Sequence, residues 1–157
     1  VRPHFPEFQF VIAGAPSLPP EFYQKYTDEN VHFVSNKTYD LLRCSEAALV
    51  TSGTATLETA LLNVPEVVCY RSSRISYEIG KRVVKNIKYI SLVNLIMDRE
   101  VVTELIQNEL TTENLVRELS LVLNENSSKI LADYQELKQK LGGSGASERA
   151  AEIILNT

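Results

Sequence analysis

A run of small and hydroxyl-bearing residues at positions 47–62 holds the side chains best suited to chemistry. Within it, Ser52, Gly53 and Thr54 stand between a short apolar run and a helix-forming segment. The first N–H groups of a helix lack partners inside the helix, and the peptide dipoles place partial positive charge there, so phosphate is a natural ligand. Glu58 follows Thr54 by one helical turn, where its carboxylate is placed to accept hydrogen bonds from sugar hydroxyls. These residues predict a cradle for a nucleotide diphosphate.

The elements that must position this motif alternate between strands and helices. Apolar runs rich in β-branched and aromatic residues predict strands at 7–13, 31–34, 47–51 and 66–70. Between them we expect helices from Pro19 through Tyr26, over 38–43, and from the motif to Asn63. Such alternation predicts a Rossmann-like parallel sheet flanked by helices on both faces. Ligands of these sheets bind outside the carboxyl ends of the strands, which is where the Ser52–Thr54 turn would emerge.

The segment 71–88 is basic although the protein as a whole is acidic. Four aliphatic residues recur at every fourth position, and Glu78 is the only acid among the basic residues Arg71, Arg74, Lys81, Arg82, Lys85 and Lys88. One interpretation is an ordinary surface helix with solvated lysines. The other is attraction to an anionic ligand or an anionic membrane surface, with Arg74, Lys81, Arg82 and Lys85 as the contacts.

The rest of the chain predicts one more strand and a series of helices. A strand at 89–93 would place Asn94 at another strand carboxyl end. We expect helices over 100–108, from a cap at Thr111 or Thr112 through Leu123, over 127–141, and over 148–155 with Ser147 as its cap. These elements predict a nucleotide-binding domain at 1–126 and a pair of carboxyl-terminal helices at 127–157.

Composition narrows the class of protein. The 157 residues are 44% hydrophobic and 23% charged, which suits one globular domain, and a net charge of -4 with a pI near 5.3 disfavours nucleic-acid binding. Cys44 and Cys69 stand in apolar runs, which favours reduced core thiols over a disulfide or a zinc site. No apolar run approaches the about 20 residues of a spanning helix and no leader opens the sequence, so we expect a cytoplasmic protein with peripheral membrane contact left open.

Four segments, in this order and spacing, resemble the carboxyl-terminal half of lipid-A-disaccharide synthase. They are residues 51–58, 67–71, 91–96 and 99–107. The resemblance implies the carboxyl-terminal domain of a GT-B-type glycosyltransferase, in which two Rossmann-like halves face each other across a cleft. It implies inverting transfer of diacylglucosamine from UDP-2,3-diacylglucosamine to a lipid-linked acceptor, 2,3-diacylglucosamine 1-phosphate, at the cytoplasmic face of the inner membrane. It implies neither a cofactor nor a metal.

The same resemblance assigns roles to individual residues. The diphosphate of UDP would be held by Ser52, Gly53 and Thr54, and the ribose by Glu58. Asn94 would be the catalytic residue near the phosphate or sugar, and the remaining positions near the cleft would be Tyr70, Arg71 and Gln107. The purely structural alternatives are a helix cap for Thr54, a solvated acid for Glu58 and a surface cation for Arg71.

Several features depart from the family or are missing. Val93 stands where proline is common, and Met97–Asp98 stands where the family has small residues, so we expect a different loop around Asn94. The family's Pro-Gly-Ser-Arg segment, the first strand of this domain and the amino-terminal half with its acidic catalytic residue would precede Val1. The chain alone is therefore expected not to catalyse transfer.

Two other classes of function fit the same pattern. A UDP-sugar epimerase of similar architecture would share the fold, but a soluble epimerase has no need of the basic segment at 74–88. A non-catalytic Rossmann-like interaction module is favoured by the scarcity of glycine in the turn at 51–54. The fold alone does not decide among them.

Overall fold

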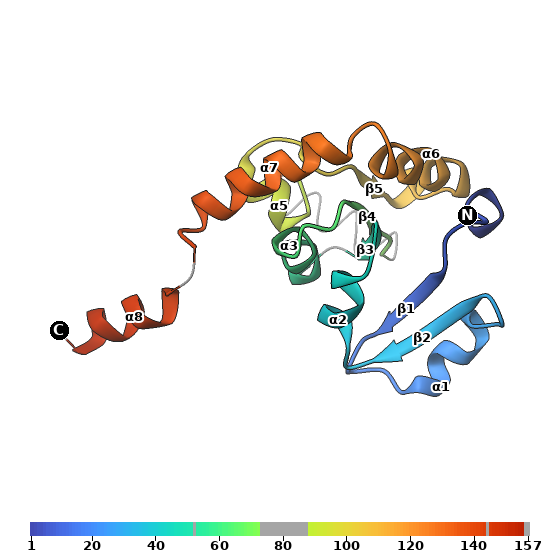
Figure 1. The fold of residues 1–157 in the computed structure, drawn as a ribbon, viewed down its shortest axis with the longest axis horizontal. Coiled ribbons are helices and arrows are strands. Elements are labelled where there is room, and N and C mark those ends of the chain that lie inside the picture. Colours follow the sequence, from blue (N-terminus) through green and yellow to red (C-terminus); the bar gives the residue numbers. More distant parts are fainter. Residues whose placement is uncertain (52, 73–87, 144, 156–157) are drawn as a thin grey trace.

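Five strands form two parallel sheets in the computed structural model, which describes residues 1–51, 53–72, 88–143 and 145–155. The first sheet pairs β1 (Phe10–Gly14) with β2 (Val31–Ser35). The second has the order β3–β4–β5, made of β3 (Ala48–Thr51), β4 (Glu66–Tyr70) and β5 (Glu104–Ile106). The α/β class with parallel strands flanked by helices is confirmed (Figure 1), although the strands divide between two sheets where the sequence predicted one.

Helices pack against the three-stranded sheet and against one another. The bounds of the helices are α1 (Pro20–Tyr23), α2 (Thr38–Arg43), α3 (Thr54–Leu61), α5 (Leu92–Met97), α6 (Thr112–Leu123), α7 (Ser127–Lys140) and α8 (Ala146–Leu155). Short 3-10 turns occupy Arg2–His4, Gln24–Tyr26 and Gln107–Glu109. Helices α3 and α6 both pack against β4, and α5 and α7 pack in turn on α3. The second sheet is therefore the centre of the molecule.

The hydrophobic core lies around β4. Val67 and Val68 of this strand are fully buried, as the central strand of a parallel sheet requires. Helix α7 adds Tyr134 and Leu137 to the same core, both without exposed surface. Since burial of apolar surface is the main favourable term in folding, α7 is held against the sheet by these core contacts.

Two elements predicted from the sequence are wrong. Residues 89–93 do not form a strand, because the Ser91 hydroxyl accepts a hydrogen bond from Asn94 N and begins α5 as its N-cap. Residues 100–108 do not form a helix, because Glu104 pairs with Val68 in β5. Both segments are short and apolar, and the secondary structure of such segments is determined by the strand or helix against which they pack.

The other predicted elements of the described chain are confirmed within a few residues, with one smaller correction. Thr111 caps α6 by accepting from Asn114 N, as the sequence predicted. Ser147 lies inside α8, which begins at Ala146, so it is not the cap of that helix. The proposed contact residues Arg74, Lys81, Arg82 and Lys85, together with Ser52, lie outside the described residues.

The two cysteines differ in their surroundings. Cys44 follows the end of α2 and is exposed, so the prediction of a core thiol is wrong for it. Cys69 lies in β4, where burial raises the pKa of its thiol to about 11. Neither thiol is in a disulfide.

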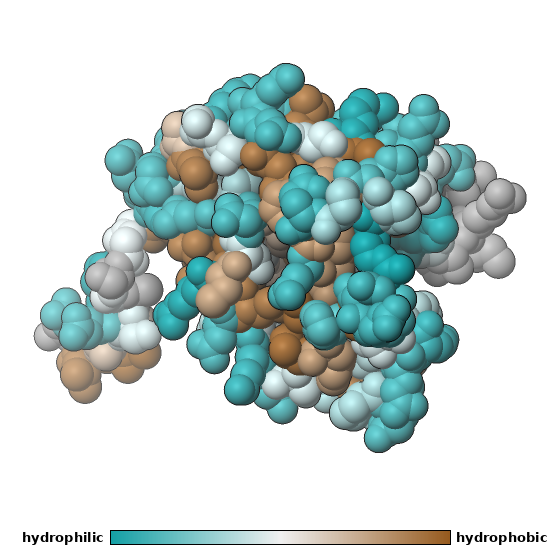
Figure 2. All heavy atoms as spheres, turned by 45° about the vertical axis from the view of Figure 1, so that its right-hand side comes forward, coloured by the Kyte–Doolittle hydropathy of each residue, from teal (hydrophilic) through white to brown (hydrophobic). Residues whose placement is uncertain are grey.

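Helix α8 extends away from the two sheets (Figure 1), and Figure 2 shows hydrophobic side chains gathered at its end. Its last turn exposes Ile153, Ile154 and Leu155 almost completely. In the described part of the chain, no helix combines the length and the hydropathy that crossing a bilayer would need.

Candidate functional site

The carboxyl edge of the three-stranded sheet gathers most of the predicted site residues. Strands β3, β4 and β5 are parallel and in register, with Thr51 opposite Cys69 and Tyr70 opposite Ile106. Each strand therefore ends at the same edge, and the chain continues there into Gly53–Thr54, Arg71 and Gln107. The structure thus joins three segments that are distant in sequence.

Gly53 makes the turn from β3 into α3. Its φ of 140° lies in the region that favours glycine, and among the described residues, its chain neighbours apart, no atom lies within 4 Å of the place that a Cβ would occupy. Gly53 is also the N-cap of α3, and no side chain caps this helix. The Thr56 hydroxyl turns inward to the Gly53 carbonyl at 2.9 Å, whereas Thr54 is exposed. The Thr56 N–H donates to the Gly53 carbonyl, whereas within the described residues the N–H groups of Thr54 and Ala55 have no hydrogen-bond partner and suit a ligand.

Glu58 lies on α3 one turn after Thr54, as the sequence predicted. Its side chain is half-buried, and within the described ranges no hydrogen bond or ion pair engages its carboxylate. An acceptor without a partner, one turn from an open helix N-terminus, suits a hydroxyl-bearing ligand.

Arg71 and Gln107 lie together across the edge of β4 and β5. The Nη2 atom of Arg71 donates to the carbonyl oxygens of Leu110 at 2.7 Å and of Gln107 at 3.5 Å. The Gln107 amide donates to the Ser72 hydroxyl at 3.1 Å, and its backbone adopts a φ of 51°. Arg71 therefore keeps its charge at the edge, and its Nε and Nη1 make no hydrogen bond to any described residue. Tyr70 ends β4 beside them and is half-buried.

Asn94 does not lie at a strand carboxyl end, which corrects its predicted place. It belongs to the first turn of α5 and has no exposed surface. Its Nδ2 donates to the Val102 carbonyl at 2.8 Å and to Glu104 Oε1 at 2.9 Å. Its Oδ1 accepts from the backbone N–H groups of Val101 at 2.7 Å and Val102 at 3.0 Å.

Glu104 is the residue that sequence reasoning missed. From β5 its carboxylate accepts hydrogen bonds from Ile90 N, Ser91 N, Ser91 Oγ and Asn94 Nδ2, at 2.7 to 2.9 Å. The available signal in the sequence was an acid inside the apolar run from Val101 to Ile106, where a helix was predicted instead. A carboxylate in such a run usually needs several hydrogen-bond partners.

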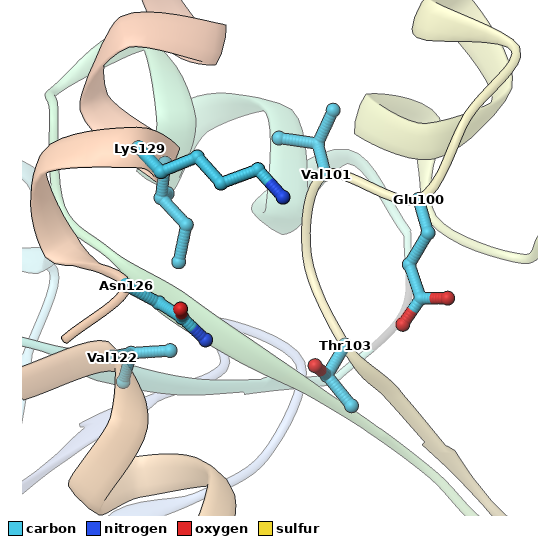
Figure 3. Close-up of a pocket in the computed structure, with 7 residues that line it drawn as sticks. Glu100, Val101, Thr103, Val122, Asn126 and Lys129 are labelled. Carbon is cyan, nitrogen blue, oxygen red and sulfur yellow. The ribbon is translucent and has the colours of Figure 1, made fainter.

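A separate pocket of about 260 Å³ opens at the amino end of β5 (Figure 3). The Lys129 ammonium of α7 points into it, opposite the loop that carries Val101. Its lining consists of Glu100, Val101, Thr103, Val122, Asn126, Lys129 and Ile130. None of the predicted site residues lines this pocket, so it is distinct from the carboxyl edge. Across the described ranges, no three His, Cys, Asp or Glu side chains lie close enough to hold a metal ion.

Comparisons with a family model and with individual proteins indicate the same family. The family model described as lipid-A-disaccharide synthetase matches residues 5–156. The lipid-A-disaccharide synthase of Geobacter metallireducens is 34% identical over 99% of this chain and 41% of its own length. Those of Synechocystis and Gloeothece citriformis are 39% and 41% identical, over 76% and 78% of this chain and 31% and 33% of their own length. The chain thus spans a third to two fifths of these relatives.

Proposed function

The chain belongs to the lipid-A-disaccharide synthase family, and from this premise we propose that the carboxyl edge of β3–β5 binds the UDP part of a sugar donor. The complete protein would be a glycosyltransferase of lipid A biosynthesis. It would transfer diacylglucosamine from UDP-2,3-diacylglucosamine to 2,3-diacylglucosamine 1-phosphate with inversion. The bond from the sugar to the diphosphate breaks, and a new bond forms to a hydroxyl oxygen of the acceptor.

The observation that carries this proposal is the open turn at Gly53. A glycine at φ 140°, with no described atom beyond its chain neighbours near its Cβ position, suits the approach of a ligand to the backbone, and the N-terminus of α3, whose N-cap is this glycine, would offer N–H groups to it. An anion at such a terminus gains about 0.3–1 kcal/mol from the helix dipole, in addition to its hydrogen bonds. The Thr54 hydroxyl extends the same cradle, and Ser52 is proposed to do so.

The neighbouring side chains suit the other parts of the nucleotide. Glu58 would accept hydrogen bonds from the ribose hydroxyls, and its unengaged carboxylate supports that role. Arg71 would face the diphosphate with Nε and Nη1, while Tyr70 and Gln107 flank it. Positive charge and N–H groups at this edge would stabilise the charge of the departing UDP without a metal.

The order of the strands supports the proposed domain organisation. A doubly wound sheet has the strand order 3-2-1-4-5-6. If β1 and β2 correspond to its strands 2 and 3, and β3, β4 and β5 to its strands 4, 5 and 6, the pairs observed in the two sheets agree with this order. The place of strand 1 then lies between β1 and β3. We propose that residues 1–126 form a nucleotide-binding domain whose first strand would occupy that place. The base that activates the acceptor hydroxyl would lie in the other half of the protein, so this chain alone would not catalyse transfer.

The proposal is tested by titrating UDP and ADP into the chain by calorimetry or ligand-observed NMR. We expect UDP to bind more tightly than ADP, because the family acts on a UDP-linked sugar. An equal response to the two nucleotides, or none, would overturn the proposal. A UDP-sugar epimerase is excluded if vesicles carrying the lipid acceptor, and not a soluble UDP-sugar alone, support turnover by the complete protein.

Peripheral attachment to an anionic membrane at the cytoplasmic face is proposed for the basic residues Arg74, Lys81, Arg82 and Lys85. Each Lys or Arg near an anionic surface contributes about 1 kcal/mol. Replacing Lys81, Arg82 and Lys85 with Gln is therefore expected to reduce co-sedimentation with phosphatidylglycerol-containing vesicles. The matched control replaces three cations elsewhere, Lys25, Lys37 and Arg43. Sedimentation that persists in the first variant would favour an ordinary solvated surface.

A further inference from the structure

Asn94 has no hydrogen-bonding capacity left for a ligand. A side-chain amide offers two N–H donors and two acceptor lone pairs. Both donors are used, by the Val102 carbonyl and by Glu104, and both acceptor positions are used, by the N–H groups of Val101 and Val102. The side chain is also fully buried. A contact with the sugar donor would require breaking one of these four bonds.

Glu104 completes the same network from β5. Its Oε1 accepts from Ser91 N, Ser91 Oγ and Asn94 Nδ2, and its Oε2 accepts from Ile90 N. Among the ion pairs of the described residues, none involves Glu104. Four donors converge on one carboxylate, and glutamine, with a single acceptor oxygen and two donors, cannot replace it.

The network joins the two elements that lie behind the carboxyl edge. On one side it fixes α5, whose Val93 and Met97 share the core with Ala60 of α3. On the other side it fixes β5, which continues directly into Gln107. Helix α3 carries the open turn, and Gln107 holds Ser72 and accepts from Arg71. A shift of α5 relative to β5 would therefore move both walls of the proposed UDP site.

We propose that Asn94 and Glu104 are positioning residues of the UDP site, locking α5 to β5 so that the first turn of α3 and Gln107 face the nucleotide together. Neither side chain contacts the sugar donor. This inference rests on the proposed function and deepens it, because it assigns Asn94 a role other than the catalytic one that the resemblance implies.

The test is a double-mutant cycle on UDP affinity, using Asn94→Ala, Glu104→Gln and the double variant. We expect each single variant to bind UDP about tenfold more weakly, and the double variant to bind about as weakly as the poorer single one, because coupled residues are not additive. Glu100→Gln is the matched control: this exposed acid lies four residues before Glu104 and outside the network, and the variant should bind UDP like the native chain.

Hydrogen exchange provides a readout that general destabilisation would not reproduce. In Glu104→Gln, the amides of Ile90 and Ser91 should exchange faster while the β4 amides keep their protection. If Asn94→Ala does not fold, Ser91→Ala replaces it in the cycle, because it removes the hydroxyl that donates to Glu104 and caps α5, and it keeps the Asn94 amide.

The outcomes separate the two proposals. Native-like UDP affinity in Glu104→Gln together with a loss in Asn94→Ala would overturn the positioning role and assign Asn94 to direct contact. Fully additive losses would overturn it as well. Absence of UDP binding by the native chain would overturn the proposed function itself, and that result is obtained before any substitution is made.

Discussion

Two polar regions of the molecule differ in how they use their hydrogen-bonding groups. At the carboxyl edge, as far as the described residues go, the first turn of α3 has no side-chain cap, the Glu58 carboxylate has no partner, and two nitrogens of Arg71 make no hydrogen bond. Around α5, both polar atoms of the Asn94 side chain are hydrogen-bonded, and one of its partners is Glu104. A binding site needs groups that are still available, whereas a saturated buried network defines the shape of the fold.

Glu66 belongs to neither region and provides a contrast with Glu104, because it is a buried carboxyl group with few hydrogen-bond partners. It is fully buried at the start of β4, where the Tyr134 hydroxyl lies 3.5 Å from Oε1 and Oε2 has no hydrogen-bond partner. Burial raises the pKa of this carboxyl to about 9, so it is protonated at neutral pH. Glu104 is held instead by four donors. The two carboxyl groups lie on adjacent strands and are stabilised in different ways. Glu104 is stabilised by hydrogen bonds from four donors, and Glu66 by remaining protonated.

The largest expected effect comes from breaking the saturated network. Asn94→Asp keeps the shape but places a carboxylate oxygen against Glu104 Oε1 and the Val102 carbonyl, where the native residue donates. We expect the free energy of unfolding to fall by about 3 kcal/mol, because an unpaired charge is buried beside another. Urea denaturation measures this. The control is Asn124→Asp at the exposed end of α6, which should change little; equal losses in the two variants would contradict a special role for the network.

A smaller effect on stability but a larger one on binding is expected at the open edge. Gly53→Ala forces a side chain into a φ of 140°, and the resulting strain would alter the turn that receives the diphosphate. We expect UDP affinity to fall about tenfold, which corresponds to about 1.4 kcal/mol. Gly143→Ala provides the control, because that glycine also has a positive φ and open space beside it. Unchanged UDP affinity in Gly53→Ala would remove this turn from the site.

The smallest effect is expected at Glu66 and depends on pH. The folded-state pKa of about 9 lies above the ordinary value of 4.5, so between these values the folded state holds one proton more than the unfolded state. Stability should therefore fall as pH rises through this window, by about 1 kcal/mol between pH 7 and pH 8. Glu66→Gln should lose this slope, as measured by urea denaturation at both pH values. Glu125→Gln, an exposed acid, should keep it; a slope retained in Glu66→Gln would show that another group titrates.

The sequence by itself determined the elements whose signals are local. The strand Glu66–Tyr70 and the helix Thr38–Arg43 have the predicted bounds, because an apolar β-branched run and a short periodic segment bounded by polar residues specify them without help. The turn between β3 and α3 was likewise predicted from its small residues, and the structure has Gly53 there at a φ of 140°. The parallel class followed from the alternation of these elements.

Tertiary structure alone decided the segment from Tyr89 to Asn108. Its apolar residues suit a strand or a helix equally, and the choice was made by pairing of Glu104 with Val68 and by the Ser91 cap. That choice moved Asn94 from a predicted strand end into the core and made Glu104 its partner. Local pattern cannot foresee such a result, because the free energy that selects the conformation comes from hydrogen bonds and packing with β4 and α3, which are distant in sequence.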